Sequence, residues 1–356
     1  IAEIVAVQQP DALVISGDIY DTTQPSASVQ QMFANAIVNI HEACEDMIIV
    51  CIAGNHDSGS KHMIFHTPWR ALNVHMVGTI SKDCNLDDYI IPVADKGYVV
   101  AVPFAADRYM PEDVFKAERN EKGLPVVLAA HLAVANSDWR GHDFSTDTNI
   151  GGLNCQELSV FADGYDYVAL GHIHKQQCLD KEKRVWYAGT PIAVSFDESY
   201  SGNEHGVLMV ECEHHGAAVS VESIPVKNIN PLVNLPFEGA AEWEDVKKML
   251  ADYDSEIPSF VRLNVEVDGY LPAGANDEAQ QIVADKKCRL CLINSKRKVQ
   301  RDHATSDQPT LTATELKQID FIEVAKMYIE SEGVTFDDEM LEMLQEVKEM
   351  LNSNQE

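Results

Sequence analysis

The chain has 356 residues, a net charge of −30 and a hydrophobic content of 45%. This length suits two domains, or one large domain with an appendage, and the negative charge excludes a surface that coats nucleic acid generally. The sequence has no apolar run of about 18 residues and no signal-peptide pattern, which excludes a predicted membrane span. Its eight cysteines are scattered, and a single CxxC pair, Cys288 and Cys291, is too little for a zinc ribbon. We therefore expect a cytoplasmic protein with reduced thiols.

The first seven residues, which begin at Ile1, have the pattern of the second half of a helix. After them, four segments share one pattern, in which a short apolar run is followed by Asp, Asn or His. Such β-branched runs are typical of strands that are buried on both faces. The four segments are Ala12 to Asp18, Ile48 to Asp57, Pro125 to His131 and Tyr167 to His174.

A helix is predicted between the first two runs. Residues 26–44 carry apolar side chains at helical spacing, and Pro25 directly before them suits a helix start. The order strand, helix, strand indicates a layered α/β domain. Reactive groups gather at the carboxyl ends of strands in such domains, so we expect the polar ends of the four runs to meet.

The residue types at these ends predict a metal centre. His172 and His174 are two apart in an extended segment, so both imidazoles point the same way. An isolated pair of this kind is more often two surface histidines, but here it closes a series of four similar ends. Asp, Asn and His without Cys form a mixed oxygen and nitrogen set suited to Mn²⁺, Fe or Zn²⁺. A carboxylate such as Asp18 can bridge two ions, which together can clamp a phosphoryl group and generate hydroxide.

The motifs resemble those of a known family. Gly17-Asp18, GNHD (Gly54 to Asp57), His131 and GHIH (Gly171 to His174) are similar to the motif series of the calcineurin-like metallophosphoesterases. With GTPIAVSFDE (Gly189 to Glu198) they resemble, more narrowly, the SbcD family of nuclease subunits of bacterial SbcCD complexes. The similarity in order and spacing runs from about residue 3 to about residue 350.

This resemblance implies a fold and an activity. The fold is an α/β, layered β-sandwich flanked by helices, with a small α/β cap domain and a C-terminal helical pair. The activity is that of a Mn²⁺-dependent DNA nuclease, an exonuclease on duplex ends and an endonuclease on single strands or hairpins, in break repair and recombination. The intact family site holds two Mn²⁺ ions, and other divalent ions are alternatives.

The resemblance also assigns roles to single residues. His56 resembles the histidine that protonates the leaving 3′ oxygen, which suits a group whose pKa lies near working pH. Asp57 is expected to support this loop and not to bind metal. The residues that resemble metal ligands are Asp18, which bridges the ions, Asn55, His131 and His172 on one ion, and His174 on the other.

Two departures from the family pattern stand out. Ala130 replaces the usual glycine before the ligand histidine, with little expected consequence. The family's first motif, Asp-x-His, supplies two ligands, and the sequence before Asp18 does not contain it. We expect the natural protein to carry that motif upstream of Ile1, and the chain as given to hold one ion well. By pattern, the remaining histidines are surface or structural residues.

Three regions are expected along the chain: a phosphoesterase domain at 1–225, an α/β cap that helps to hold DNA at 226–301, and a linker with a helical segment at 302–356. In the cap, alternation predicts a strand at 259–268, followed by a helix at 275–285 and a strand at 287–294. Residues 286–301 include seven Lys or Arg and no acid. This basic cluster is either a solvated strand edge or a contact for the DNA backbone.

Partners follow from the resemblance. Two amphipathic helices, at about 312–331 and 337–351, have too little core of their own, so they either pack on this chain or dock on the ATPase SbcC. A homodimer is expected through the helix at 26–44 and one at about 60–72; alternatively, their apolar residues only face the sheet. Two rival functions remain: a small-molecule phosphodiesterase with the same metal core, and a catalytically silent scaffold that binds SbcC and DNA.

Overall fold

The computed structural model describes most of residues 1–297 and little beyond them. The chain divides into two compact units, 1–298 and 299–356. The predicted C-terminal helical pair lies outside the described residues, apart from three positions. The described residues are 1–64, 66–105, 110, 114, 123–141, 155–161, 164–180, 182, 184–200, 202–297, 340, 341 and 345.

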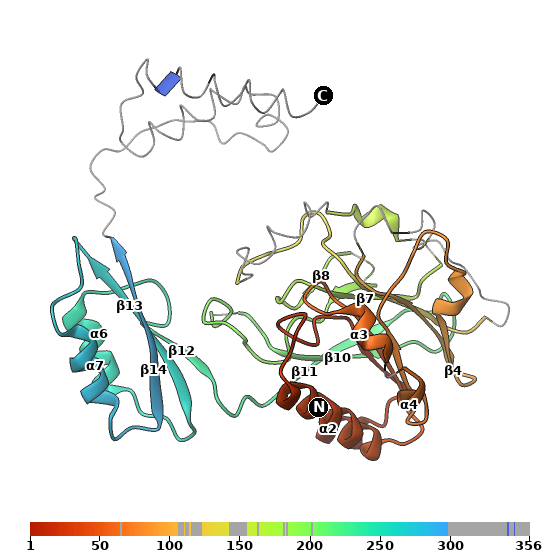
Figure 1. Ribbon diagram of the computed structural model, residues 1–356, viewed down its shortest axis with the longest axis horizontal. Coiled ribbons are helices and arrows are strands. Elements are labelled where there is room, and N and C mark those ends of the chain that lie inside the picture. Colours follow the sequence, from red (N-terminus) through yellow and green to blue (C-terminus); the bar gives the residue numbers. More distant parts are fainter. Residues whose placement is uncertain are drawn as a thin grey trace. The chain divides into compact units, whose positions relative to one another are not determined.

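A small parallel sheet and two helices form the first layer of the fold (Figure 1). Ile49 and Cys51 of the central strand pack against Val5 and Ile37 of the helices. Ser26 caps the longer helix, where its hydroxyl accepts a hydrogen bond from the Val29 amide at 3.4 Å. The helix predicted at 26–44 is thereby confirmed. The elements are α1 (Ala2–Gln8), β1 (Ala12–Ile15), α2 (Ala27–Ala43), β2 (Ile48–Ile52) and β3 (Val74–Val77).

A larger mixed sheet forms the second layer. Its strand order is β4-β5-β6-β7-β9-β8, with the four central strands parallel and the outer pairs antiparallel. The apolar runs predicted around residues 125–131 and 167–174 are two of the central strands. The strands are β4 (Ile90–Val93), β5 (Gly97–Val102), β6 (Val126–His131), β7 (Tyr167–Gly171), β8 (Gln177–Cys178) and β9 (Val185–Tyr187).

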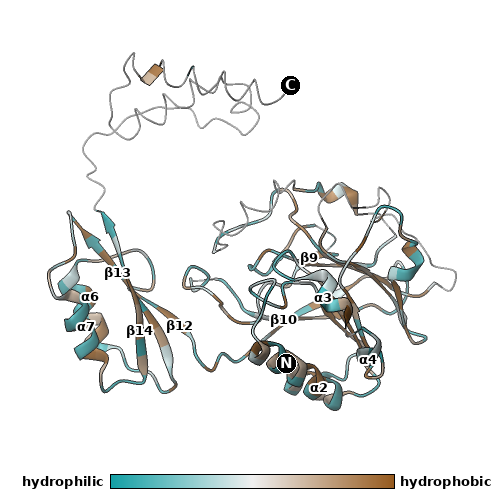
Figure 2. Cartoon of the chain, in the orientation of Figure 1, coloured by the Kyte–Doolittle hydropathy of each residue, from teal (hydrophilic) through white to brown (hydrophobic). Residues whose placement is uncertain are grey.

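The two sheets pack face to face. Val50 and Ile52 of β2 point away from the helices and pack on Val99, Ala101 and Ala129 of the larger sheet. Alternation along β6 places Leu128 and Ala130 in a second core on the far face of that sheet. Figure 2 shows how hydrophobic these strands are along their length. The predicted layered β-sandwich with flanking helices is confirmed.

Shorter elements complete this domain. A hairpin of β10 and β11 is tied to the larger sheet by Asp166, whose buried carboxylate accepts from the amides of Val126 and Gly216, each at 2.7 Å. Two short helices stand where a helix was expected at about 60–72. The elements are α3 (Gly59–Ile64), α4 (His66–Arg70), η1 (Leu86–Tyr89), η4 (Leu158–Val160), β10 (Gly206–Glu211) and β11 (Ser220–Pro225).

Residues 232–297 form a separate β-α-β-α-β arrangement with a core of its own. Val246 and Leu250 of the first helix pack with Ala279 of the second on Val261 and Leu263 of the middle strand. The two strands and the helix predicted here are present, but the sequence pattern did not predict the first strand or the first helix. The elements are β12 (Leu232–Leu235), α6 (Trp243–Asp252), β13 (Ser259–Val267), α7 (Ala275–Val283) and β14 (Cys288–Arg297), with the strands parallel in this order.

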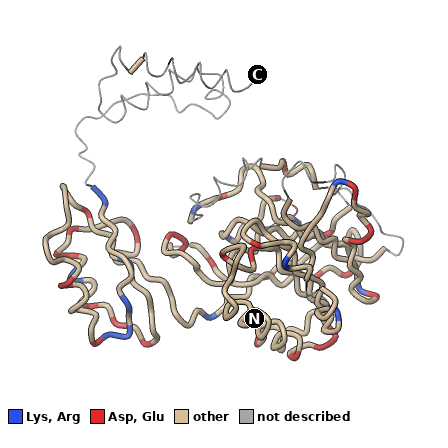
Figure 3. The backbone as a smooth tube through the Cα atoms, in the orientation of Figure 1, with Lys and Arg blue, Asp and Glu red and all other residues tan. Residues whose placement is uncertain are grey.

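Within the described part of the basic cluster, residues 286–297, the charges lie toward the two ends of β14 (Figure 3). Lys286 Nζ donates to the carbonyls of Ala251 and Tyr253, each at 2.6 Å, and Lys287 Nζ donates to the Glu256 carbonyl at 3.2 Å. These two lysines therefore close the connection between α6 and β13. At the other end of the strand, residues 296 and 297 are exposed. Among the described helices, none is long and apolar enough to cross a membrane.

Candidate metal centre

The carboxyl ends of β1, β2, β6 and β7 meet, although these strands belong to two different sheets. His131 ends β6, and its Nε2 lies 2.9 Å from Asn55 Oδ1 and 3.2 Å from Asp18 Oδ2. His172 directly follows β7, and its Nδ1 lies 3.1 Å from the same Asn55 oxygen. Ligand atoms of Asp18, His131 and His172 all lie within 4.8 Å of one another. The structure thus brings together four of the five predicted ligands.

Close backbone contacts hold these ends together. The Ser16 carbonyl accepts a hydrogen bond from His131 Nδ1 at 2.7 Å, and the Ser16 hydroxyl donates to the Ala169 carbonyl at 3.1 Å. A Cβ at Gly171 would lie 1.7 Å from the Ser16 carbonyl oxygen, and a Cβ at Gly54 would lie 2.0 Å from Asp18 Oδ1. Glycine is therefore required at both positions, for steric reasons.

Two of the converging residues also have a strained backbone conformation. Asp18 has φ 49° and His172 has φ 102°, in the region that residues with a Cβ seldom adopt. Strain of this kind persists where the surrounding structure fixes it, and it gathers at functional sites. Both residues are among the predicted ligands.

The electrostatics of the cluster favour a positive charge at its centre. Burial raises the pKa of Asp18, but the charge and hydrogen bond of His131 and the His56 amide outweigh this and bring it to about 2. Burial lowers the pKa of His131, but the Asp18 charge outweighs this and leaves it above its usual value. Because the Ser16 carbonyl fixes a hydrogen on Nδ1, His131 Nε2 faces Asp18 and Asn55. A carboxylate, an amide oxygen and two imidazoles fit a divalent ion such as Mn²⁺, Fe²⁺ or Zn²⁺.

His56 lies beside this cluster and does not point its Nδ1 into it. Its backbone amide donates to Asp18 Oδ1 at 3.0 Å, and its ring Nδ1 donates to the Asp21 carbonyl at 3.0 Å. This second bond fixes the tautomer of the neutral ring, with the hydrogen on Nδ1 and a lone pair on Nε2. The Nε2 atom is then the position at which a proton can be taken up and released.

Asp57 supports the loops, as expected. Its buried carboxylate accepts from the amides of Gly54 at 2.8 Å, Ile19 at 3.1 Å and Tyr20 at 3.0 Å. The loop after β1 and the loop after β2 are thereby fastened to one side chain. Because these loops carry Asp18 and Asn55, Asp57 sets the distance between two of the predicted ligands.

His174 stands apart from the other predicted ligands. It does not belong to the group whose ligand atoms lie within 4.8 Å of one another in the described residues. Its Nδ1 is held by Glu198 Oε1 at 2.7 Å, which leaves the lone pair on Nε2. Carboxylates often orient metal-binding histidines in this way. The sequence contained Glu198 only as part of a family motif and gave it no role.

Two basic side chains lie next to the predicted ligands. Lys175 follows His174, and both Lys175 and Arg140 pair with Asp138; the Arg140 pair measures 2.7 Å. Hydrogen bonds from Arg140 and Lys175 hold the pKa of Asp138 far below its usual value. The guanidinium of Arg140 lies 5.5 Å from the centre of the Tyr200 ring. This rim, formed by Arg140, Lys175 and Asp138, carries two cations and one carboxylate.

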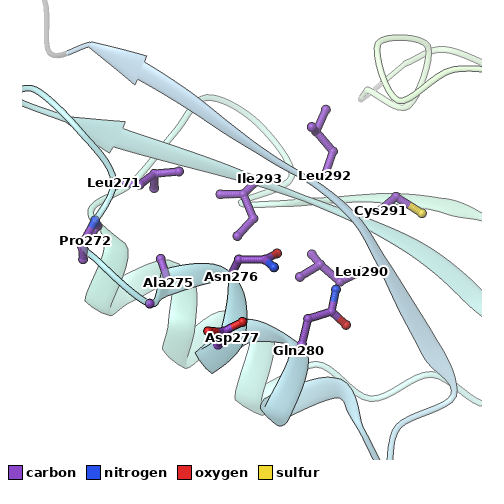
Figure 4. Close-up of a pocket in the computed structure, with 11 residues that line it drawn as sticks. Leu271, Pro272, Ala275, Asn276, Asp277, Gln280, Leu290, Cys291, Leu292 and Ile293 are labelled. Atoms are coloured by element: carbon purple, nitrogen blue, oxygen red, sulfur yellow. The ribbon is translucent and has the colours of Figure 1, made fainter.

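A hollow of about 490 Å³ lies elsewhere, in the β-α-β-α-β arrangement of residues 232–297, which we call the smaller domain. Figure 4 shows that it is lined by residues of α7 and β14, with apolar side chains such as Leu290 and Ile293 facing it. None of the predicted ligands lines this hollow. It therefore offers no alternative to the metal centre.

Comparison with known proteins agrees with this geometry. Residues 1–176 match the profile of the calcineurin-like phosphoesterases. The chain contains a calcineurin-like phosphoesterase domain. This family uses divalent metals, which accords with the donor set found here.

The chain is also similar to two curated proteins, each named as the SbcD component of the nuclease SbcCD. The protein from Rhodobacter capsulatus is 28% identical over 277 residues, which cover 69% of this chain and 67% of the relative. The protein from Escherichia coli K12 is 25% identical over 354 residues, which cover 88% of this chain and 82% of the relative. The similarity to SbcD thus extends well beyond the phosphoesterase domain.

Proposed function

We propose that this chain is the nuclease subunit of an SbcCD-type complex and hydrolyses phosphodiester bonds of DNA with Mn²⁺. The observation that carries this proposal is the convergence of Asp18, Asn55, His131 and His172 at the meeting point of two sheets. The similarity to SbcD proteins over most of the chain directs the choice of substrate to DNA. A chromosomal DNA substrate would place the protein in the bacterial cytoplasm.

The four converging residues would hold one ion, with Asp18 shared toward a second ion that His174 helps to hold. A divalent ion bound there supplies charge neutralisation at the phosphodiester and a hydroxide for attack. The protein's own part is to orient these donors. The Ser16 carbonyl does so for His131 and the Glu198 carboxylate does so for His174, because each fixes the hydrogen on Nδ1 and leaves Nε2 as the donor atom for a metal.

His56 is the proposed general acid. Its Nδ1 is committed to the Asp21 carbonyl, so a proton can be delivered from Nε2 to the leaving oxygen. Its backbone amide donates to Asp18 Oδ1. This bond keeps His56 beside a proposed ligand, and the ring itself does not need to bind metal. General acid catalysis of this kind contributes on the order of 10²-fold or more.

The rim formed by Arg140 and Lys175 supports a polyanionic substrate. A nucleic acid strand carries one negative charge per phosphate, and phosphate contacts come mainly from Lys and Arg. In a chain of net charge −30, two cations beside the metal centre would give a local attraction for phosphate. Double-strand exonuclease and single-strand or hairpin endonuclease activity are the proposed reactions.

The proposed partners are the ATPase SbcC and a second copy of this chain. The helical segment at 302–356 is the proposed SbcC-binding part, and residues 226–301 the proposed DNA cap. For the homodimer, the relevant surface is α2 with α3, where large apolar side chains are exposed. Their exposed fractions are 44% for Val29, 70% for Met32, 40% for Met63 and 68% for Ile64.

A comparison of substrates tests this proposal. Purified protein with Mn²⁺ should cleave duplex and hairpin oligonucleotides much faster than cyclic nucleotides or nitrophenyl phosphodiesters. Preference for the small substrates would favour the alternative of a small-molecule phosphodiesterase. Absence of turnover on every substrate, with DNA and SbcC binding retained, would favour the alternative of a silent scaffold.

A further inference from the structure

The turn Ser195–Ser199 touches the metal centre on one side. Glu198, with 1% of its surface exposed, accepts a hydrogen bond from His174 Nδ1 at 2.7 Å. The second carboxylate oxygen of Glu198 accepts from the Thr190 hydroxyl at 3.1 Å and the Val194 amide at 3.0 Å. The carboxylate is thus fully used, and its position fixes the ring of His174.

The same turn is bound by the smaller domain on its other side. Arg262 of β13 forms an ion pair with Asp197 at 2.7 Å, and its guanidinium lies 5.3 Å from the centre of the Phe196 ring. Arg262 Nε also donates to Asn234 Oδ1 at 2.8 Å. Only 13% of the Arg262 side chain is exposed, and its bond to the buried Asn234 is costly to break.

Asn234 of β12 also binds the Ser195–Ser199 turn. Its amide nitrogen donates to the carbonyls of Phe196 at 2.9 Å and Ser199 at 3.0 Å. The Ser199 hydroxyl donates back to the Leu232 carbonyl at 2.8 Å. Asn234 is 3% exposed. Its side-chain amide makes two hydrogen bonds to the turn and one to Arg262, so it has little freedom to move.

The turn is also backed by the loop after β6. A Cβ at Gly141 would lie 3.0 Å from the Asp197 carbonyl oxygen and 3.1 Å from Glu198 Cα. The turn therefore rests against that loop and is also held by Arg262 and Asn234. If those two contacts are lost, we expect Glu198 to shift, and the ring of His174 with it.

We propose that Arg262 and Asn234 of the smaller domain are positioning residues for His174, and that they act through the Ser195–Ser199 turn. The smaller domain then serves the metal centre directly, in addition to any contact with DNA. The role of His174 as a ligand rests on the proposed function. The effect on its ring orientation does not, because the contacts are present without metal.

The test uses the full chain and two readouts. Nitrogen NMR of the metal-free protein reports the tautomer of His174, and Mn²⁺ titration reports metal affinity. Glu198→Gln should remove the preference for hydrogen on Nδ1 and weaken Mn²⁺ binding about tenfold, a typical effect of losing a carboxylate that orients a ligand histidine. Arg262→Gln should shift both readouts in the same direction, and Arg262→Lys, which keeps the charge, should restore part of the loss.

Two further variants keep the test decisive. Asp197 has a side chain that is 70% exposed, so Asp197→Asn breaks the ion pair with Arg262 without disturbing a core and should give the same change, in smaller degree. Arg289→Gln, at an exposed position of β14, is the matched control and should change neither readout. An unaltered His174 tautomer in both Arg262→Gln and Asp197→Asn overturns the proposal. A shifted tautomer in a protein that binds no Mn²⁺ supports the positioning role and contradicts the proposed function instead.

Discussion

Replacement of Asp57 by alanine is expected to cost stability and not a metal ligand. The Asp57 carboxylate, whose side chain is completely buried, accepts from the amides of Gly54, Ile19 and Tyr20 at 2.8, 3.1 and 3.0 Å. A hydrogen bond to a charged group contributes about 1.5–3 kcal/mol, and an amide left buried without a partner is costly. The three bonds share one side chain and are not additive, so we expect a loss of about 4 kcal/mol.

Thermal and urea unfolding measure this loss. For a protein of this size, about 4 kcal/mol corresponds to a fall in Tm of about 5 °C. Asp57→Asn keeps one acceptor and should lose roughly half as much, whereas Asp46→Ala, at an exposed position, should change stability by less than about 0.5 kcal/mol. A loss below about 1 kcal/mol for Asp57→Ala, or a normal Tm with one Mn²⁺ fewer, would refute the supporting role and make Asp57 a ligand.

Four other outcomes are expected. His56→Ala should slow DNA cleavage by about 10²-fold while Mn²⁺ binding persists; normal cleavage would remove His56 from the mechanism. Met32→Glu, at a side chain that is 70% exposed, should convert a dimer to a monomer in light scattering, and a wild-type protein that is already monomeric at micromolar concentration would contradict the proposed dimer. Deletion of residues 312–356 should abolish SbcC binding and leave ATP-independent cleavage, and retained binding would place that interface elsewhere. Mn²⁺ affinity should fall as pH is lowered through the raised pKa of His131, since the proton competes for Nε2, whereas Asp18, with a pKa of about 2, stays ionised in that range; an affinity independent of pH between about 5 and 8 would argue against His131 as a ligand.

Much of the phosphoesterase fold was predictable because its strands are short, apolar and followed by polar residues. The four runs became β1, β2, β6 and β7, and their carboxyl ends met as expected. The hydrophobic pattern of the sequence alone does not show that β1 and β2 belong to a separate sheet from β6 and β7. That division depends on which face of β2 packs on β5 and β6, a long-range property that the local pattern does not contain.

The candidate site was predictable in its ligands and not in its supports. Asp18, Asn55, His131 and His172 are marked by their place after strands, and the structure brings them together. Glu198 escaped because its contact with His174 joins residues 24 positions apart through a turn, and nothing in the spacing shows this. The missed β12 has a similar cause, since it has four residues and pairs with the distant β13. Helix α6 could have been predicted, because its buried residues Trp243, Val246 and Leu250 lie at helical spacing.

Crystals of the chain grown with Mn²⁺ provide the most direct test of the metal centre. Anomalous diffraction at the manganese edge should show a peak bounded by Asp18 Oδ2, Asn55 Oδ1, His131 Nε2 and His172, with ligand distances shorter than the present separations between these atoms. His131 should keep its Nδ1 on the Ser16 carbonyl, since that bond aims the ring. A well-occupied manganese peak held by other residues, or no peak among these four at saturating Mn²⁺, would contradict the account.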